Sequence, residues 1–202
     1  MVKSSSKNSR LSHLSTIDSH SRELNVIIET PKGSRNKFKY DEEYGLFKLG
    51  GLLPVGTVFP YDFGFLPSTL GGDGDPLDVL VLMDEPAFTG CLVQARLLGV
   101  IEAEQTEDGE TTRNDRLIAV ATNTHTLREV RSLDQLSESK VNEIEHFFVS
   151  YNTAKGKQFK PIGRFGPRHA EKLVEEGTHH FRRKNLPSPK SSSQGHSKAK
   201  KR

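Results

Sequence analysis

At 202 residues the chain is long enough to form one domain with its own hydrophobic core. Its charge is unevenly distributed: residues 182–202 carry eight basic residues and no acidic ones, and residues 1–22 carry a net charge of +3. The total of +3 therefore leaves about −8 for residues 23–181. An acidic body argues against nucleic acid as the main partner, because duplex binding normally needs a basic face.

Cysteine content and hydropathy point to the cell interior. The lone Cys91 excludes an internal disulfide and is typical of a reducing compartment. No apolar run approaches the roughly 18 residues of a membrane span, and the Ser-rich start lacks the apolar stretch of a signal peptide. We therefore expect a soluble, cytoplasmic protein without membrane attachment.

Both ends of the chain have compositions that disfavour folding. Residues 1–21 are Ser-rich and aperiodic, and residues 182–202 are basic and low in complexity. We expect a disordered N-terminal arm over 1–21, a globular domain over 22–181 and a disordered basic tail over 182–202. The tail is the one part of the chain whose charge would let it hold nucleic acid or polyphosphate loosely.

Strand patterns dominate the start of the predicted domain, as β-branched runs bounded by Gly or Pro. Residues 37–41 and 45–49 are expected to form a hairpin, and the Gly- and Asp-rich stretch 107–114 to be a hairpin loop. The predicted strands are 24–29, 37–41, 45–49, 57–59, 79–83, 91–101 and 116–122.

The period of the apolar residues changes after residue 136. They then recur at three- and four-residue steps as far as Tyr151, which predicts a helix over 136–151 with Ser137 as its cap. A second helix is expected from about 167 to 177. Many short strands followed by helices predict an α+β domain with a barrel-like sheet.

Three carboxylates lie within six residues, in the string Asp73-Gly74-Asp75-Pro76-Leu77-Asp78, and a buried strand follows them. Like charges packed this closely repel one another unless a cation lies between them. Oxygen ligands suit hard divalent ions such as Mg²⁺. The alternative is a plain Asp-Gly turn at the start of a strand, although three acids exceed what a turn needs.

Further motifs accompany this turn. Glu29 ends the first predicted strand, Lys37 lies in the segment Ser34-Arg35-Asn36-Lys37, and Tyr151 closes the first helix before the Lys155-Gly156-Lys157 run. Together with Asp-Gly-Asp-Pro-Leu-Asp-Val-Leu-Val and His146-Phe147-Phe148, these strings resemble the soluble (family I) inorganic pyrophosphatases, and the chain looks like a divergent member. The resemblance covers about residues 26–160.

The resemblance implies a fold, a reaction and a cofactor. The fold is an OB-like closed five-stranded β-barrel with added β-hairpins and two C-terminal helices, so that residues 22–181 become a catalytic domain. The reaction is Mg²⁺-dependent hydrolysis of inorganic diphosphate to two phosphates by direct attack of metal-activated water. The family also assembles as dimers or hexamers, which implies a homo-oligomer.

The same resemblance implies roles for individual residues. Asp75 would be the general base, and Lys37, Arg116 and Tyr151 would be catalytic residues that bind phosphate oxygens. The implied metal ligands are Asp73, Asp75, Asp78, Glu29, Glu107 and Asp115. These roles make chemical sense, because metal binding lowers the pKa of water from about 15.7 towards neutrality and cations stabilise the leaving phosphate.

Several positions depart from the family pattern. Lys39 stands where an acid is expected, although Asp41 lies on the same strand face and is a candidate replacement. Gly51 stands where a phosphate-binding Arg is expected, and Asn152 where a Lys is expected. Phe63 replaces a Tyr near the general base, and Tyr61 is the nearby hydroxyl.

The loop before Arg116 is longer than usual in the family. Strict spacing from Arg116 puts Asn114 at the expected position of a metal-binding acid, with Asp115 one residue away; we favour Asp115 as the ligand and Glu107 as its partner.

Two other functions compete with hydrolysis. One is a repurposed or weakly active relative that binds or acts on another phosphate compound, such as an organic pyrophosphate or a polyphosphate end. The other is a barrel that binds nucleic acid, which the negative charge of residues 23–181 argues against.

Overall fold

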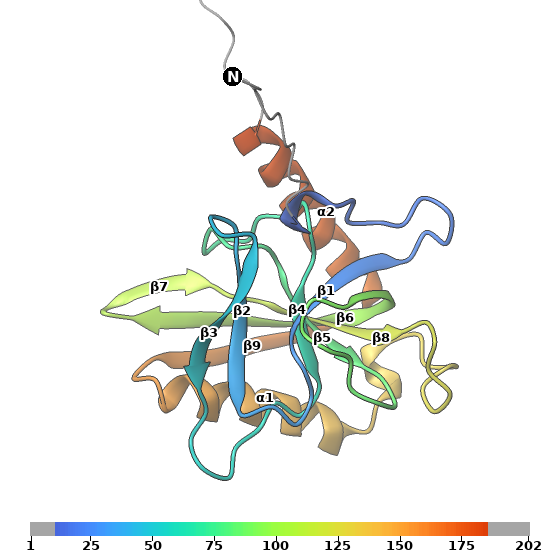
Figure 1. Cartoon of the computed structure of the whole chain (residues 1–202). Coiled ribbons are helices and arrows are strands. Elements are labelled where there is room, and N and C mark those ends of the chain that lie inside the picture. Colours follow the sequence, from blue (N-terminus) through green and yellow to red (C-terminus); the bar gives the residue numbers. More distant parts are fainter. Residues whose placement is uncertain (1–10, 186–202) are drawn as a thin grey trace, which may run out of the picture.

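The computed structural model describes residues 11–185, in which a mixed β-sheet and a separate hairpin are flanked by two α-helices (Figure 1). The helices are α1 (Glu138–Thr153) and α2 (Pro167–Asn185), and short 3-10 turns lie at Leu11–His13 and Leu133–Gln135. The strands are β1 (Leu24–Thr30), β2 (Asn36–Asp41), β3 (Leu46–Leu52), β4 (Asp62–Phe65), β5 (Asp78–Leu82), β6 (Leu92–Glu107), β7 (Glu110–Arg113), β8 (Arg116–Ala121) and β9 (Gln158–Phe165).

Five of the strands pair in a ring. β1 pairs with β4, β4 with β5, β5 with β8, β8 with β6, and β6 pairs again with β1. Only the β5–β8 pairing in this ring is parallel. The 16 residues of β6 are long enough for two further partners, β7 and β9, while β2 and β3 form the separate hairpin.

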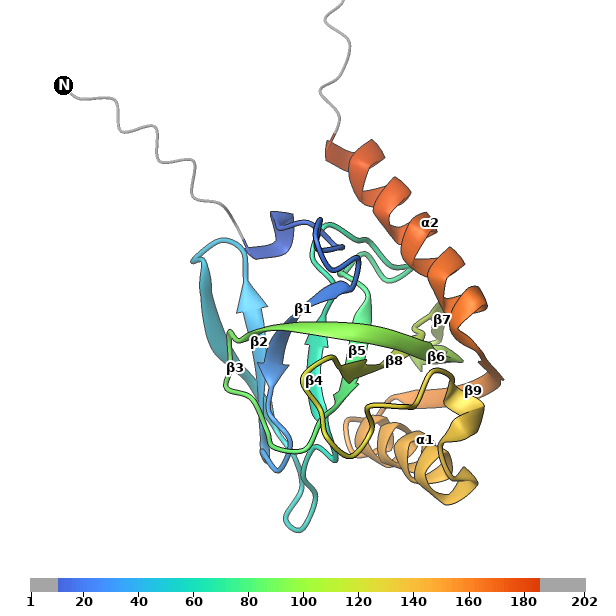
Figure 2. The same ribbon diagram turned by 90° about the vertical axis from the view of Figure 1, so that its right-hand side faces the viewer.

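The pleat of the strands divides the core into two clusters. On β5, Leu80 and Leu82 pack with apolar residues of α1, whereas Val79 and Val81 belong to the cluster that also includes Ala170 of α2. Successive strand residues point to opposite faces, so the continuous apolar run of β5 serves both clusters. Figure 2 shows the result: α1 lies beside β9, and α2 contacts β6 and extends away from it at a steep angle.

Two glycines permit close contacts between strands. A Cβ atom at Gly64 of β4 would lie 2.0 Å from the carbonyl oxygen of Ile27 in β1, and one at Gly99 of β6 would lie 2.2 Å from that of Phe165 in β9. No side chain fits at such distances, so only glycine allows these strands to approach at these points.

Most predicted elements are confirmed, and several differ. Residues 57–59 form no strand: a turn at Gly56 precedes them, and Phe59 makes isolated backbone bonds to the loop at Gly33 and Ser34. β4, β7 and β9 were not predicted. β7 lies within the stretch 107–114 that was expected to be a loop, and β9 contains Pro161 and Gly163, residues that normally indicate a loop.

Helix α2 continues well past Gly177, where the second helix was expected to end. Gly177 lies against Leu77, and a Cβ atom there would be 2.8 Å from the Leu77 Cδ1 atom. This glycine therefore permits close packing and does not end the helix. Neither described α-helix is apolar enough over a sufficient length to cross a membrane.

The described part of the predicted N-terminal arm lies against the domain. Thr16 is buried and its hydroxyl donates to the carbonyl oxygen of Pro67 at 2.7 Å, and Ile17 forms a β-bridge with Leu24. Residues 1–10 of the arm and residues 186–202 of the tail lie outside the described part of the chain.

Candidate active site

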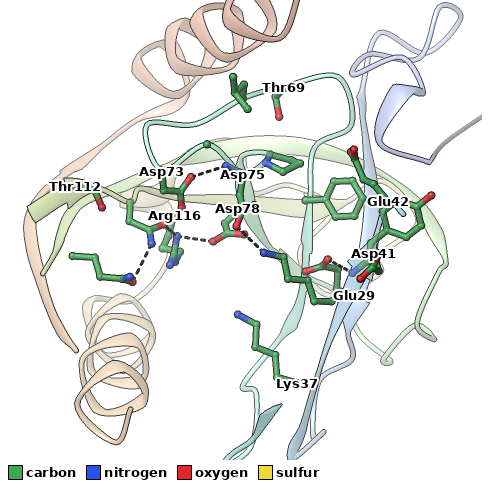
Figure 3. Close-up of a pocket in the computed structure, with 18 of the residues that line it drawn as sticks. Glu29, Lys37, Asp41, Glu42, Thr69, Asp73, Asp75, Asp78, Thr112 and Arg116 are labelled. Atoms are coloured by element: carbon green, nitrogen blue, oxygen red, sulfur yellow. Dashed lines mark hydrogen bonds and ion pairs between the residues drawn. The ribbon is translucent and has the colours of Figure 1, made fainter. Parts of the chain in front are cut away.

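A cavity of about 890 Å³ lies between the β2–β3 hairpin, the loop from β4 to β5, the β6–β7 hairpin and the end of α1 (Figure 3). Charged side chains of both signs line it. The acids that the sequence singled out are Glu29, Asp73, Asp75, Asp78 and Glu107, and the cations include Lys37, Lys39, Arg116, Lys155 and Lys157.

The triple-Asp segment is a tight turn that leads into β5. The N–H of Gly71 donates to the carbonyl oxygen of Asp75 at 2.7 Å, and Gly74 has the positive φ of 86° that the turn requires. The N–H of Asp75 also donates to the Asp73 carboxylate at 3.1 Å. Asp78 is the first residue of β5, so all three carboxylates border the cavity.

Repulsion and desolvation are visible at Asp73. The cavity walls desolvate its carboxylate and raise its pKa, although the side chain reaches solvent at the cavity edge. The bond from the Asp75 N–H opposes this shift, while the charges of Asp78 and Asp75 raise the pKa further. This turn therefore favours a cation beside it.

Protein cations neutralise the other two carboxylates of the turn. The ammonium of Lys39 lies 2.7 Å from Asp75 Oδ2, and the guanidinium of Arg116 lies 2.7 Å from Asp78 Oδ2. Burial alone would lower the pKa of Lys39, but Asp75 and the more distant Glu29 raise it above its usual value. Lys39 is therefore a charged partner of the residue that was expected to be the base.

Arg116 is less accessible than a phosphate ligand was expected to be. Only 6% of its side chain is exposed, and its guanidinium lies 5.0 Å from the centre of the Phe148 ring. It also bonds Asn114 and donates to the carbonyl oxygen of Asp115 at 3.0 Å. Arg116 is thus nearly buried at the wall of the cavity, where its guanidinium pairs with Asp78.

Glu29 is a buried carboxyl on β1 that faces the same cavity (Figure 3). It accepts a hydrogen bond of 2.7 Å from the N–H of Tyr40 on β2. Burial raises the pKa of Glu29 to about 7, helped by repulsion from Asp78 and opposed by the Tyr40 bond and by Lys37 and Lys39. A cation beside Glu29 would favour its charged form.

The long hairpin brings Asn114, and not Asp115, to the cavity. Asp115 accepts a bond of 3.0 Å from the N–H of Ala103 and pairs with Arg113 at 3.0 Å, so its carboxylate is held at the base of the hairpin. Glu107 does line the cavity, where it pairs with Lys157 at 2.5 Å.

The end of α1 supplies a phenol and a lysine to the opposite wall. The hydroxyl of Tyr151 is buried and has no hydrogen-bond partner within residues 11–185. The Lys37 ammonium lies 5.5 Å from the centre of its ring, and the Lys155 ammonium lies 4.5 Å from it. A buried hydroxyl without a hydrogen-bond partner is costly, which favours a ligand that accepts a hydrogen bond from it.

The remaining altered positions have defined environments. Phe63 is buried against Phe59 and Phe148, and Tyr61 packs against the α1 cluster without lining the cavity. Asp41 lines the cavity but pairs with Lys48 at 2.5 Å. Neither candidate replacement therefore supplies an unpaired group next to the Asp turn.

Within residues 11–185, no three His, Cys, Asp or Glu side chains are grouped closely enough to form a metal site without rearrangement. Asp75 and Asp78 instead contact Lys39 and Arg116. The donor set is nevertheless of the right kind for Mg²⁺, because it consists of carboxylate oxygens around one cavity and includes Asp73, which forms no ion pair with the described residues.

Comparisons with known proteins agree on one family. A family model described as inorganic pyrophosphatase matches residues 26–182. An inorganic pyrophosphatase of Halalkalibacterium halodurans is 39% identical over 153 residues, which are 76% of this chain and 91% of that protein. One from Streptomyces coelicolor is 38% identical over 161 residues, covering 79% and 96%.

A solved structure gives the same result. The crystal structure of inorganic pyrophosphatase from Thermus thermophilus aligns with a TM-score of 0.78 and 34% identity, over 86% of this chain and 99% of that one. The structural similarity therefore extends over most of the chain, and the family match includes the cavity residues from Glu29 to Lys157.

Proposed function

The chain belongs to the inorganic pyrophosphatase family and is an inorganic diphosphatase, and we propose that it hydrolyses diphosphate in the cavity bordered by the Asp turn. The observation that supports this site most directly is the meeting of Asp73, Asp75 and Asp78 with Lys37 and Tyr151 around one volume. The reaction gives two phosphates by direct attack of water, without a covalent intermediate.

Carboxylate oxygens would hold the metal. Asp73, Asp75, Asp78, Glu29 and Glu107 are the proposed ligands of Mg²⁺, which when bound acidifies water and neutralises substrate charge. We propose Asn114 in place of Asp115 as the neighbouring oxygen ligand, because Asn114 lines the cavity, where its Oδ1 accepts a bond from Arg116, whereas Asp115 does not line it and is held by Ala103 and Arg113.

Asp75 is the proposed general base. Its Oδ2 bonds to Lys39, which leaves Oδ1 to accept the proton of the attacking water. The turn holds Asp75 at the cavity edge through its carbonyl bond to Gly71 and its N–H bond to Asp73. The Lys39 contact thus orients the carboxylate with one oxygen available.

Lys37, Arg116 and Tyr151 are the proposed phosphate-binding residues. Lys37 forms no ion pair with residues 11–185, so it can give its full charge to a phosphoryl oxygen. The hydroxyl of Tyr151 would donate to another. Arg116 keeps Asp78 in place and lies near enough to share its charge with the leaving phosphate.

The ring of five strands supports the OB-like closed β-barrel expected from the sequence, with residues 22–181 as the catalytic domain. We also propose a homo-oligomer, a dimer or hexamer, because large apolar side chains of the β2–β3 hairpin and its surroundings are exposed. They are Tyr44, Leu46, Leu49, Leu52, Val55, Phe88 and Leu92. The lone Cys91 supports a cytoplasmic location.

The alternative is a relative that binds metal diphosphate without turning it over. The Lys39–Asp75 ion pair is the observation that favours it, because a cation occupies one oxygen of the proposed base and stands where an acid is expected. Activity measurements separate the two functions directly.

Phosphate release from magnesium diphosphate tests the proposal. We expect release by the wild type and a loss of about 100-fold or more in Asp75→Asn, because general-base catalysis contributes factors of this size. Asp134→Asn, an exposed acid away from the cavity, is the control. A full rate in Asp75→Asn would refute the base, and retained diphosphate binding without release by the wild type would favour the alternative.

A further inference from the structure

Lys155 is fixed in position by the turn that ends α1. The N–H groups of Lys155 and Lys157 both donate to the carbonyl oxygen of Asn152, at 2.9 and 3.0 Å. Gly156 takes a positive φ of 75° between them, which closes the turn. The Lys155 side chain therefore leaves the helix end at a defined point and lines the cavity.

The Lys155 ammonium has no carboxylate partner among residues 11–185. By contrast, Lys39, Lys48, Lys157 and Arg116, which line the same cavity, are each paired with an acid. The neighbours of Lys155 are the Tyr151 ring, 4.5 Å from the ammonium, and the backbone of Gly51, where a Cβ atom would lie 3.7 Å from it. Its charge is thus available to an anion.

The absence of a side chain at Gly51 leaves room for this ammonium. Asn152, the next candidate on the helix, cannot occupy that space, because it is only 3% exposed and its amide donates to the carbonyl oxygen of Phe148 at 2.8 Å. The two positions at which the family pattern leads one to expect cations therefore contribute none. The Lys155 ammonium lies beside Gly51 and over the ring of Tyr151.

We propose that Lys155 is a substrate-binding residue that contacts a phosphoryl group of diphosphate in the space left open by Gly51. The Tyr151 hydroxyl and the Lys37 ammonium lie on the same wall, so a phosphoryl group there meets two unpaired cations and a hydroxyl that lacks a partner. This inference rests on the proposed function of the cavity and assigns one more residue to it.

Binding and turnover are measured on the full-length chain with three variants. Lys155→Met removes the charge and keeps the apolar stem over Tyr151, and Lys155→Arg keeps the charge. Lys160→Met removes another exposed charge, outside the cavity. The readouts are KM and kcat for magnesium diphosphate, and the Kd of the non-hydrolysable analogue methylenediphosphonate with Mg²⁺ by calorimetry.

We expect Lys155→Met to raise both KM and Kd by about 10-fold or more, since a bond between charged groups contributes that much. Lys155→Arg should stay within about threefold of the wild type, and Lys160→Met within about twofold. Wild-type Kd values in Lys155→Met would overturn the proposal. If the wild type binds the analogue but releases no phosphate, the proposed function fails while the binding data still test Lys155.

A double variant tests the space beside Gly51. In Gly51→Arg with Lys155→Met, the new guanidinium can enter the volume that the Lys155 ammonium leaves, and we expect about fivefold recovery of Kd over Lys155→Met alone. No recovery would overturn the assignment of that volume to a phosphoryl group.

Discussion

The two walls of the cavity differ in the sign of their charges and in whether those charges are paired. On the acidic wall, formed by Glu29, Asp73, Asp75 and Asp78, repulsion is reduced by Lys39, by Arg116 and by the raised pKa values of Glu29 and Asp73. On the cationic wall, formed by Lys37, Tyr151 and Lys155, neither lysine is paired with an acid in residues 11–185. The acidic wall is thus organised around cations and the cationic wall around an anion.

This contrast locates where the chain departs from its family. The three turn aspartates are present, but Lys39 introduces a cation beside the base. On the cationic wall, the charges expected at Gly51 and Asn152 are missing, and the Lys155 ammonium lies beside Gly51. Metal ligation depends on several oxygens at fixed places, whereas a phosphate accepts a cation from several directions, so the second wall tolerates rearrangement more readily.

The largest effect is expected on the acidic wall, from Asp73→Asn. Asp73 forms no ion pair with the described residues, and Asn keeps the acceptor for the Asp75 N–H, so the turn should fold normally. We expect phosphate release to fall by about 1,000-fold, because a proposed metal ligand loses its charge. Asp108→Asn, at the tip of the β6–β7 turn, should retain the wild-type rate; equal rates in both variants would contradict the role of Asp73.

Glu29 should make the metal-free protein less stable as pH rises. Its pKa is raised from 4.5 to about 7 by burial, so its stabilising contribution is complete below about pH 4.5 and is lost as pH rises through 7. In EDTA at pH 8, Glu29→Gln should therefore be about 3 kcal/mol more stable than the wild type in urea unfolding. At pH 4.5 the difference should vanish, and a constant difference at both pH values would contradict the burial of the charge.

Lys39→Glu should change the metal requirement of the enzyme. The substitution removes the ammonium from Asp75 and adds an oxygen ligand at a position where the family pattern has an acid. We expect the Mg²⁺ concentration for half-maximal activity to fall by about 10-fold, because one added contact between a carboxylate and the metal contributes about that much binding free energy. Lys32→Glu, exposed and outside the cavity, is the control for net charge; a higher Mg²⁺ requirement in Lys39→Glu would show that Lys39 serves the substrate.

The smallest effect is expected on the cationic wall, from Tyr151→Phe. The variant removes a buried hydroxyl that has no partner in the described protein, so the melting temperature should stay the same or rise slightly. KM for magnesium diphosphate should rise by about fivefold, since a neutral hydrogen bond contributes about 1 kcal/mol. An unchanged KM would mean that the Tyr151 hydroxyl does not reach the substrate.

The strongly patterned elements could be predicted from the sequence, and the interrupted ones could not. β1, β5, β8 and α1 have apolar patterns that continue through each element, and Ser137 caps α1 as expected, whereas α2 was predicted only as far as Gly177. β9 was missed because Pro161 and Gly163 interrupt it, and it forms only because the long β6 offers a free edge. Local propensity was overridden by tertiary pairing in that case.

The residues of the site divide in the same way. The spacing of Asp73, Asp75 and Asp78 along one turn predicted that three carboxylates lie near one another, and all three do border one cavity. Their residue type alone indicated oxygen ligands for a divalent cation. Which cations pair with an acid and which stay unpaired was decided only in the folded chain. Lys39, Arg116 and Lys155 reach the cavity from a hairpin, a strand and a helix end that are distant in sequence. Charge pairing over such separations depends on distances of a few ångströms, and only tertiary packing sets these.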